Sequence, residues 1–124
     1  MSQASFEVRL DEQLQIVCQR VVGSMDEHDF KALTNATAAC VARLKDPARV
    51  RILVDSREMS HANARARRAG MAMFERPELE RLALWGGGPL ARVLVSFFSI
   101  VTGKQNMRAF ATEQEARDWL TRSP

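Results

Sequence analysis

The feature that most constrains this chain is a regular alternation between short apolar runs and longer segments of helical periodicity. Residues 5–10 and 14–22 both alternate as strands do, and only the polar residues 11–13 separate them, which favours an antiparallel hairpin. Further strand and helix patterns then alternate along the rest of the chain. Strands are expected at 50–55, 82–85 and 107–110, and helices at 26–45, 60–74, 89–102 and from 112 onward.

The order ββαβαβαβα predicts an α/β fold with one mixed sheet, in which the later strands are parallel and helices pack against the sheet. A length of 124 residues suits a single domain over residues 1–124, without internal repeats or linkers. Cys18 and Cys40 fall on apolar faces of the predicted elements. We therefore interpret both cysteines as core residues.

The N-terminal residues and the composition indicate where the protein is located and which classes of partner it binds. The N-terminal residues carry neither a basic leader nor an apolar core, so we expect a cytoplasmic protein. Residues 89–101 form the longest apolar stretch, but it is interrupted by Arg92 and is shorter than the ~20 residues of a membrane span. A formal net charge of +3, with interleaved acids, does not favour nucleic acid as a partner. Fifteen of the eighteen basic residues are arginine, which suits recognition of carboxylate or phosphate groups.

Three segments give the chain a family resemblance. Residues 50–55 form a strand that ends in aspartate, and residues 82–86 form the next strand. Residues 110–120 have the form F-x-T-x-x-x-A-x-x-W-L. Together with the order of elements, they resemble the STAS-type (anti-sigma-factor-antagonist-like) domains, in particular a divergent branch of stand-alone bacterial members.

The resemblance implies a regulatory module that binds proteins and responds to phosphorylation. In the family, the phosphorylated serine lies near the start of the helix that follows the aspartate-ending strand. Here the hydroxyls in that segment are Ser56 and Ser60, which are the candidate phosphoacceptors. The segment reads D-S-R-E-M-S-H-A-N and lacks the family forms D-S-S-G and D-[ST]-G.

The helix expected at 60–74 carries a second candidate surface. Ser60 is placed to cap the N-terminus of this helix with its hydroxyl, and a phosphate on that hydroxyl would also be favoured there. His61, Arg65 and Arg68 recur at helical spacing and would share one face. They could recognise an acidic or phosphorylated partner, or simply form a solvated charged face.

The end of the strand at 50–55 is a third candidate. Asp55 lies where open α/β sheets bind their ligands, although an aspartate there often only accepts hydrogen bonds from loop amides. The glycines at 86–88 could present amides to an anion or serve as a turn. The sequence contains no nucleotide-binding, metal-ligand or nucleophile motif, so we expect no cofactor, no metal and no catalytic residues.

The helix expected at 89–102 has an apolar arc of roughly 220° at 100° per residue, too broad for one sheet face. Three occupants could cover the excess: the protein core, a second subunit, or an apolar ligand. The residues assigned to this candidate face are Leu94, Val95, Phe98 and Ile100.

The sequence therefore predicts a non-catalytic, cytoplasmic module that binds a protein partner and forms a homodimer. The region from Asp55 to Arg68 is its expected working surface. The alternative is a domain that binds or senses a small apolar or lipid-like molecule against the helix at 89–102.

Overall fold

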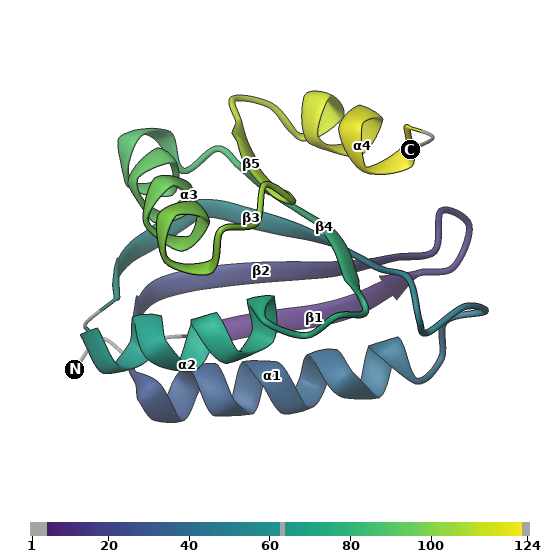
Figure 1. The fold of residues 1–124 in the computed structure, drawn as a ribbon, viewed down its shortest axis with the longest axis horizontal. Helices are drawn as coiled ribbons and strands as arrows, with labels where there is room; N and C mark the ends of the chain where they lie inside the picture. The colour runs from purple at the N-terminus through teal and green to yellow at the C-terminus, as the bar shows by residue number, and fades with distance from the viewer. Residues whose placement is uncertain (1–4, 63, 123–124) are drawn as a thin grey trace.

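In the computed structural model, which describes residues 5–62 and 64–122, five strands form one mixed sheet in the order β1-β2-β3-β4-β5 (Figure 1). β1 is antiparallel to β2, and the other neighbouring strands are parallel. The elements are β1 (Ser5–Asp11), β2 (Ile16–Met25), α1 (Glu27–Val41), β3 (Val50–Ala62), α2 (Ala64–Phe74), β4 (Leu79–Trp85), α3 (Gly88–Thr102), β5 (Met107–Phe110) and α4 (Glu113–Thr121). The predicted α/β class and the order of elements are confirmed.

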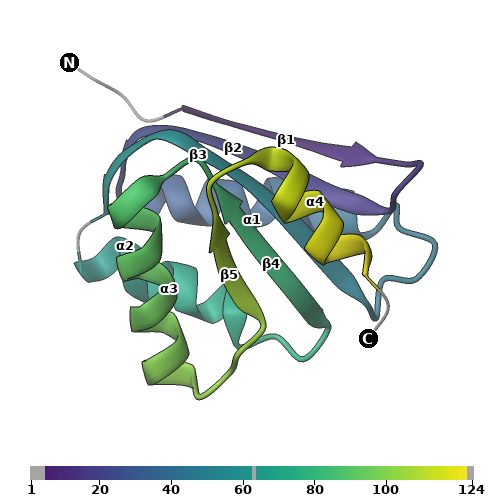
Figure 2. The same cartoon turned by 90° about the horizontal axis from the view of Figure 1, so that it is seen from above.

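Helices cover both faces of the sheet, and α1 and α4 lie on opposite sides of it (Figure 1). Figure 2 shows α2 and α3 beside each other, on the side of the molecule away from α4. The alternation of side chains along β3 explains the two layers. Ile52 and Val54 join the larger core with α1 and α3, whereas Leu53 packs with Trp119 and Leu120 of α4.

Three helix ends are capped by particular residues. Asp26 caps α1, accepting a hydrogen bond from the backbone N–H of Asp29, whose side chain bonds back to the amide of Asp26. The Thr112 hydroxyl caps α4 by accepting a hydrogen bond from the backbone N–H of Glu115. Gly103 ends α3 with a φ of 71°, in the left-handed region where a residue with a side chain is strained.

Two strands start at other residues than expected, and one helix ends earlier. β2 begins at Ile16 instead of residue 14, because Leu14 lies in the turn and donates its amide to Asp11 Oδ1 at 3.0 Å. β4 begins at Leu79 instead of residue 82, since Leu79 pairs with Val50 at the start of β3. α1 ends at Val41 and turns follow it.

The segment after Asp55 differs most from the expectation. β3 continues to Ala62, and α2 begins only at Ala64. The cause is β2, which also continues past its expected end, to Met25, and pairs with β3 up to Met25 opposite Ala62. Pairing with a neighbouring strand here overrides the local helical pattern.

This extension corrects the predicted roles of two residues. Ser60 is a strand residue and does not cap α2; its hydroxyl lies 3.1 Å from that of Ser24 on β2. His61 also belongs to β3, paired with Ser24 in the register, and its side chain is outside what the structure describes. His61 therefore shares no helix face with Arg65 and Arg68, which lie on α2.

The predicted apolar face of α3 divides between core and surface. Phe98 is only 7% exposed and belongs to the core, and Leu94 and Val95 pack partly buried against it. Ile100 is 82% exposed. The apolar residues that α3 leaves on the surface are Val93, Phe97, Ile100 and Val101. The arc is broader than the sheet can cover, but of the predicted residues only Ile100 lies fully on its outer side.

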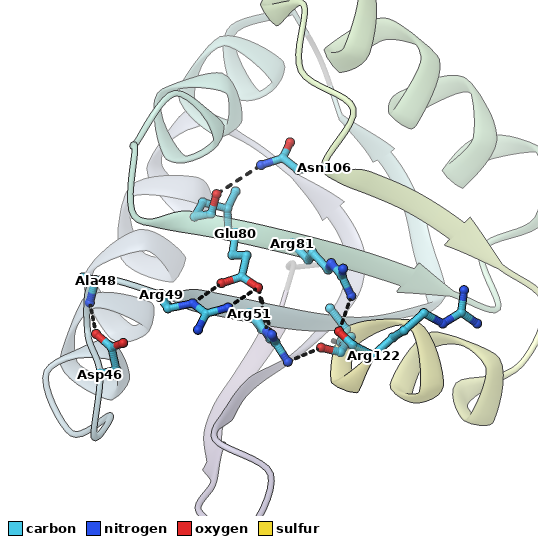
Figure 3. Close-up of polar contacts among 10 residues, drawn as sticks. Asp46, Ala48, Arg49, Arg51, Glu80, Arg81, Asn106 and Arg122 are labelled. Atoms are coloured by element: carbon cyan, nitrogen blue, oxygen red, sulfur yellow. Dashed lines mark hydrogen bonds and ion pairs between the residues drawn. The ribbon is translucent and has the colours of Figure 1, made fainter. Parts of the chain in front are cut away.

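Arginines from the sheet hold the C-terminal end of α4 (Figure 3). Arg51 donates to the carbonyl of Leu120 at 2.6 Å, and Arg81 donates to the carbonyls of Trp119 and Arg122. Glu80 in turn accepts from Arg51 and from Arg49. These contacts satisfy carbonyls that have no partner inside the helix, and cations there suit the helix dipole.

Among the described residues, none of the helices has the length and apolar character needed to cross a bilayer.

Because α3 divides between core and surface, truncating two nearby side chains on it should change the free energy of unfolding by very different amounts. Phe98→Ala is expected to lower the free energy of unfolding by about 3–5 kcal/mol, because it opens a cavity in the core. Ile100→Ala, on the exposed side of the same helix, is expected to change it by less than about 0.5 kcal/mol. Chemical denaturation of both variants measures the difference, and equal losses would contradict the assignment of Ile100 to the surface.

Candidate functional site

The candidate site begins at the point where β4 ends beside β3, with Asp55 paired to Trp85. Arg57 donates to both carboxylate oxygens of Asp55, from Nε to Oδ1 at 3.0 Å and from Nη2 to Oδ2 at 2.8 Å. The guanidinium carbon of Arg57 lies 4.4 Å from the centroid of the Trp85 ring. We call Asp55, Arg57 and Trp85 the Trp85 stack. A bidentate ion pair lying over an indole fixes the direction of all three side chains.

Ser56 points away from the stack and is buried. The residue is 1% exposed, and its hydroxyl donates to the carbonyl of Trp85 at 2.9 Å. A Cβ added at Gly87 would lie 2.7 Å from Ser56 Oγ. Ser56 thus ties β3 to the end of β4, and Gly87 leaves the space that this contact needs.

The glycine turn after β4 also supports the stack. Gly86 has a φ of 76°, and a Cβ there would lie 2.4 Å from Cγ of Arg57. Only glycine fits both the backbone conformation and the approach of the arginine stem. The glycines at 86 and 87 therefore act as spacers between β4 and its neighbours on β3.

A polar pocket of about 250 Å³ lies beside the stack, on the same sheet face as α4. Its charged lining comes from β1, β2, β3 and α4, with arginines and carboxylates in equal number. These residues are Glu7, Arg9, Arg20, Asp55, Arg57 and Glu113. The balance of charge suits a small polar group or a protein surface of mixed charge.

Electrostatics at this pocket fix the protonation of two groups. The hydrogen bonds from Arg57 hold the pKa of Asp55 below its usual range, so the carboxyl is ionised at neutral pH. Burial raises the pKa of the Cys18 thiol, which lines the pocket, so this cysteine stays protonated.

Nε1 of Trp85 is buried without a hydrogen-bond partner among the described residues.

The arginines predicted on α2 lie elsewhere. Arg65 lines an open hollow of about 380 Å³ together with Asp26, Glu27 and His28 at the start of α1. Arg68 is exposed on the same helix. α2 packs against α1, whereas Asp55 lines the pocket on the α4 face. The structure therefore does not bring Asp55 together with Arg65.

Sequence analysis found Asp55 but missed Arg57 and Trp85. If the strand had been predicted to continue past Asp55, the alternation of side chains would have placed Arg57, two residues later, on the same face as Asp55. Trp85 was recognised only as the end of a strand, and no local signal shows that it lies opposite Asp55.

Within residues 5–62 and 64–122, no three His, Cys, Asp or Glu side chains cluster as a metal ion requires.

The ion pair of the stack predicts a dependence of stability on pH. Because the folded-state pKa of Asp55 is lowered, its carboxylate stabilises the fold above the unfolded-state value of about 3.9, and this contribution is lost as the pH falls through the folded-state pKa. Asp55→Asn is expected to cost about 1 kcal/mol at neutral pH, a modest value because Arg57 faces solvent, and progressively less as the pH falls through the lowered pKa of Asp55.

Unfolding free energies of both proteins across this range test the prediction. Asp118→Asn is the matched control, since Asp118 is exposed on α4 and makes no ion pair within the part of the chain that the structure describes. A cost of Asp55→Asn that does not change with pH would contradict the role of the carboxylate charge.

Comparison with known proteins gives the family. A family model described as SpoIIAA-like matches residues 16–121. An uncharacterised Shewanella loihica protein with a SpoIIAA-like fold is 17% identical, with a TM-score of 0.68 over 97% of this chain and 98% of that chain. The anti-sigma factor antagonist SpoIIAA in its unphosphorylated form is 18% identical, with a TM-score of 0.63 over 93% and 96%.

At these identities the two structures show a common fold and nothing further. No curated protein matches the chain. The family model covers most of the sequence, from the start of β2 to the end of α4, and it agrees with the STAS-type resemblance of the three sequence segments. The chain belongs to the SpoIIAA-like family.

Proposed function

We propose that this protein is a non-catalytic regulatory domain that acts by binding other proteins in the cytoplasm. The observation that carries the proposal is its membership of the SpoIIAA-like family over residues 16–121. A structural relative is named as an anti-sigma factor antagonist, in an unphosphorylated form. We extend two features of that name to this chain, a protein partner and control by phosphorylation.

The state of the polar groups at the site supports binding over catalysis. The Asp55 carboxylate is held by Arg57, and the Ser56 hydroxyl is buried and bonded to a backbone carbonyl. Neither group is arranged as an activated base or nucleophile, because such groups face a substrate and contact each other. The arrangement instead stiffens the end of the sheet.

Of the two candidate serines, Ser60 is the better phosphoacceptor. It is exposed, and its hydroxyl lies beside that of Ser24, which is also exposed. A kinase would reach Ser56 only after its bond to Trp85 breaks. A phosphate on Ser60 would place about two negative charges beside the end of β2 and change what this edge binds.

Phosphorylation is tested on protein purified from its own host. The intact mass is expected to include one phosphate group, located on Ser60 by peptide fragmentation. Ser60→Ala should abolish the added mass, whereas Ser24→Ala, the matched control on the neighbouring strand, should retain it. Phosphate on Ser56, or none under any growth condition, would contradict the assignment.

The proposed partner surface is α2. Arg65 and Arg68 are exposed there, and the helix Ala64–Phe74 contains no acidic residue. Arginines on an exposed helix suit a partner with carboxylate or phosphate groups. Asp55 contributes to a different face, so it is not part of this surface.

Charge reversal tests this surface. The combined change Arg65→Glu with Arg68→Glu is expected to weaken binding to the partner by tenfold or more, about 1.4 kcal/mol, without shifting the thermal midpoint. The partner is first identified by cross-linking in the host and mass spectrometry, and then titrated in pure form by calorimetry.

The matched control is Arg43→Glu with Lys45→Glu, an equal change of charge at exposed positions after α1. If this control weakens binding as strongly, α2 is not the binding surface. A lower thermal midpoint in the α2 variant would show that the two arginines serve stability.

A second candidate function has one observation in its favour. An apolar cavity of about 60 Å³ lies between the sheet and the helices, and it includes Leu94 and Phe98 of α3 with Met59 and Gly70. This volume is well below the roughly 150 Å³ of a cavity that takes benzene. Binding of a lipid-like molecule would require α2 and α3 to move, and native mass spectrometry of host-purified protein would detect the retained molecule.

We also propose that the protein is a homodimer, because the exposed apolar residues of α3 and an open edge of the sheet both remain to be covered.

A further inference from the structure

The two edges of the sheet differ in how open they are. β5 closes one edge with only four residues, whereas β1 forms the other edge with seven residues in an unbroken register against β2. No described segment pairs with the outer side of β1. Proteins protect such edges with proline, charged side chains, bulges or short strands, and of these β1 has only the charges of Glu7, Arg9 and Asp11. A long edge without proline or bulge is suited to accept another strand whose charges are complementary.

The sequence of β1, S-F-E-V-R-L-D, is complementary to itself when two copies run antiparallel about Val8. In this register Glu7 of each copy lies opposite Arg9 of the other, so the symmetry makes two pairs of opposite charge. Phe6 likewise lies opposite Leu10. Paired residues share a face, so the charges meet on one side of the joined sheet and the apolar residues on the other.

Neighbouring registers lack this complementarity. If the axis passes through Glu7, the two copies of Glu7 face each other. If it passes through Arg9, the two arginines face each other, and Glu7 lies opposite Asp11. A shift by a single residue would bring the charged side chains onto the apolar face. An axis through Leu10 would also place Arg9 opposite Asp11, but it would pair only residues 9–11 of the strand. Charge and the length of paired strand together select the register about Val8.

The side chains that this register needs are available within one copy. Glu7 and Arg9 are exposed, and neither forms an ion pair within residues 5–62 and 64–122. Phe6, Val8 and Leu10 are only partly buried against the core, so further apolar surface remains to be covered at this edge. By contrast, α3 carries Arg92 and no acidic residue, so its exposed apolar stripe has no charge that selects a second copy.

We infer that β1 is the interface of the homodimer, with the sheets of two copies joined antiparallel about Val8 through the Glu7 and Arg9 pairs. This inference rests on the proposed homodimer but not on the proposed protein partner of α2. The core beneath α1 then continues from one copy to the next along Phe6, Val8 and Leu10.

Two charge reversals test the register. Glu7→Arg places the introduced guanidinium opposite Arg9 of the other copy, and Arg9→Glu places two carboxylates opposite each other, in both cases twice per dimer. Each variant is expected to raise the dimer dissociation constant, measured by analytical ultracentrifugation, about tenfold or more. The double variant Glu7→Arg with Arg9→Glu restores opposite charges and should dimerise like the wild type.

Mixing the two single variants is the decisive measurement. The Glu7→Arg copy then carries two arginines at these positions and the Arg9→Glu copy two glutamates, so the mixture should form a heterodimer, visible by native mass spectrometry. Glu7 lies opposite Arg20 of β2 within its own copy, so Glu7→Arg could also disturb the fold of the single chain. Formation of the heterodimer would show that both variants are folded.

Three results would overturn the inference. If the wild type is monomeric at all concentrations, the proposed homodimer is wrong, but the proposed binding of a protein partner by α2 is not affected. Single variants that dimerise as the wild type does place the interface elsewhere, such as on α3. Single variants that stay monomeric after mixing show that the two charges do not face each other.

Discussion

The parallel pairing of β2 with β3 determines where the other parts of the protein lie. The two strands are paired from Val17 and Ile52 to Met25 and Ala62. Their central position leaves β1 on one side and β4 on the other, and the two faces of β3 supply both cores. Because the pair extends past the end of β4, it also sets the start of α2. The apolar residues of β3 thus connect layers that local helix signals alone could not arrange.

The fold could be predicted because its signals are local. Alternation identified the strands, and helical spacing of apolar residues identified the helices. The extension of β3 could not be predicted in this way, since Ser60 and its neighbours become strand residues only through contact with β2. Similarly, the periodicity of α3 showed that its apolar arc is too broad, but only the sheet decides that Phe98 faces inward and Ile100 outward.

Sequence analysis found only one residue of the Trp85 stack, for a related reason. Asp55 was recognisable from its place after an apolar strand, but its surroundings depend on Arg57 and Trp85. The link to Trp85 is set by the register of β3 against β4, which the sequence of either strand does not contain. The glycines after β4 had two interpretations, as a turn or as an anion site. Their close approach to Ser56 and Arg57 gives them a third role, as spacers.

The placement of the aromatic residues gives the protein two separate optical probes. The chain has two tryptophans and no tyrosine, so its near-ultraviolet emission comes from Trp85 and Trp119. Trp85 lies under Arg57 at the end of β4, and Trp119 packs between α4 and the sheet near Arg81 and Phe110. Replacing one indole by phenylalanine leaves a single fluorophore. The remaining one then reports either on the pocket beside Asp55 or on the docking of α4, without any added label.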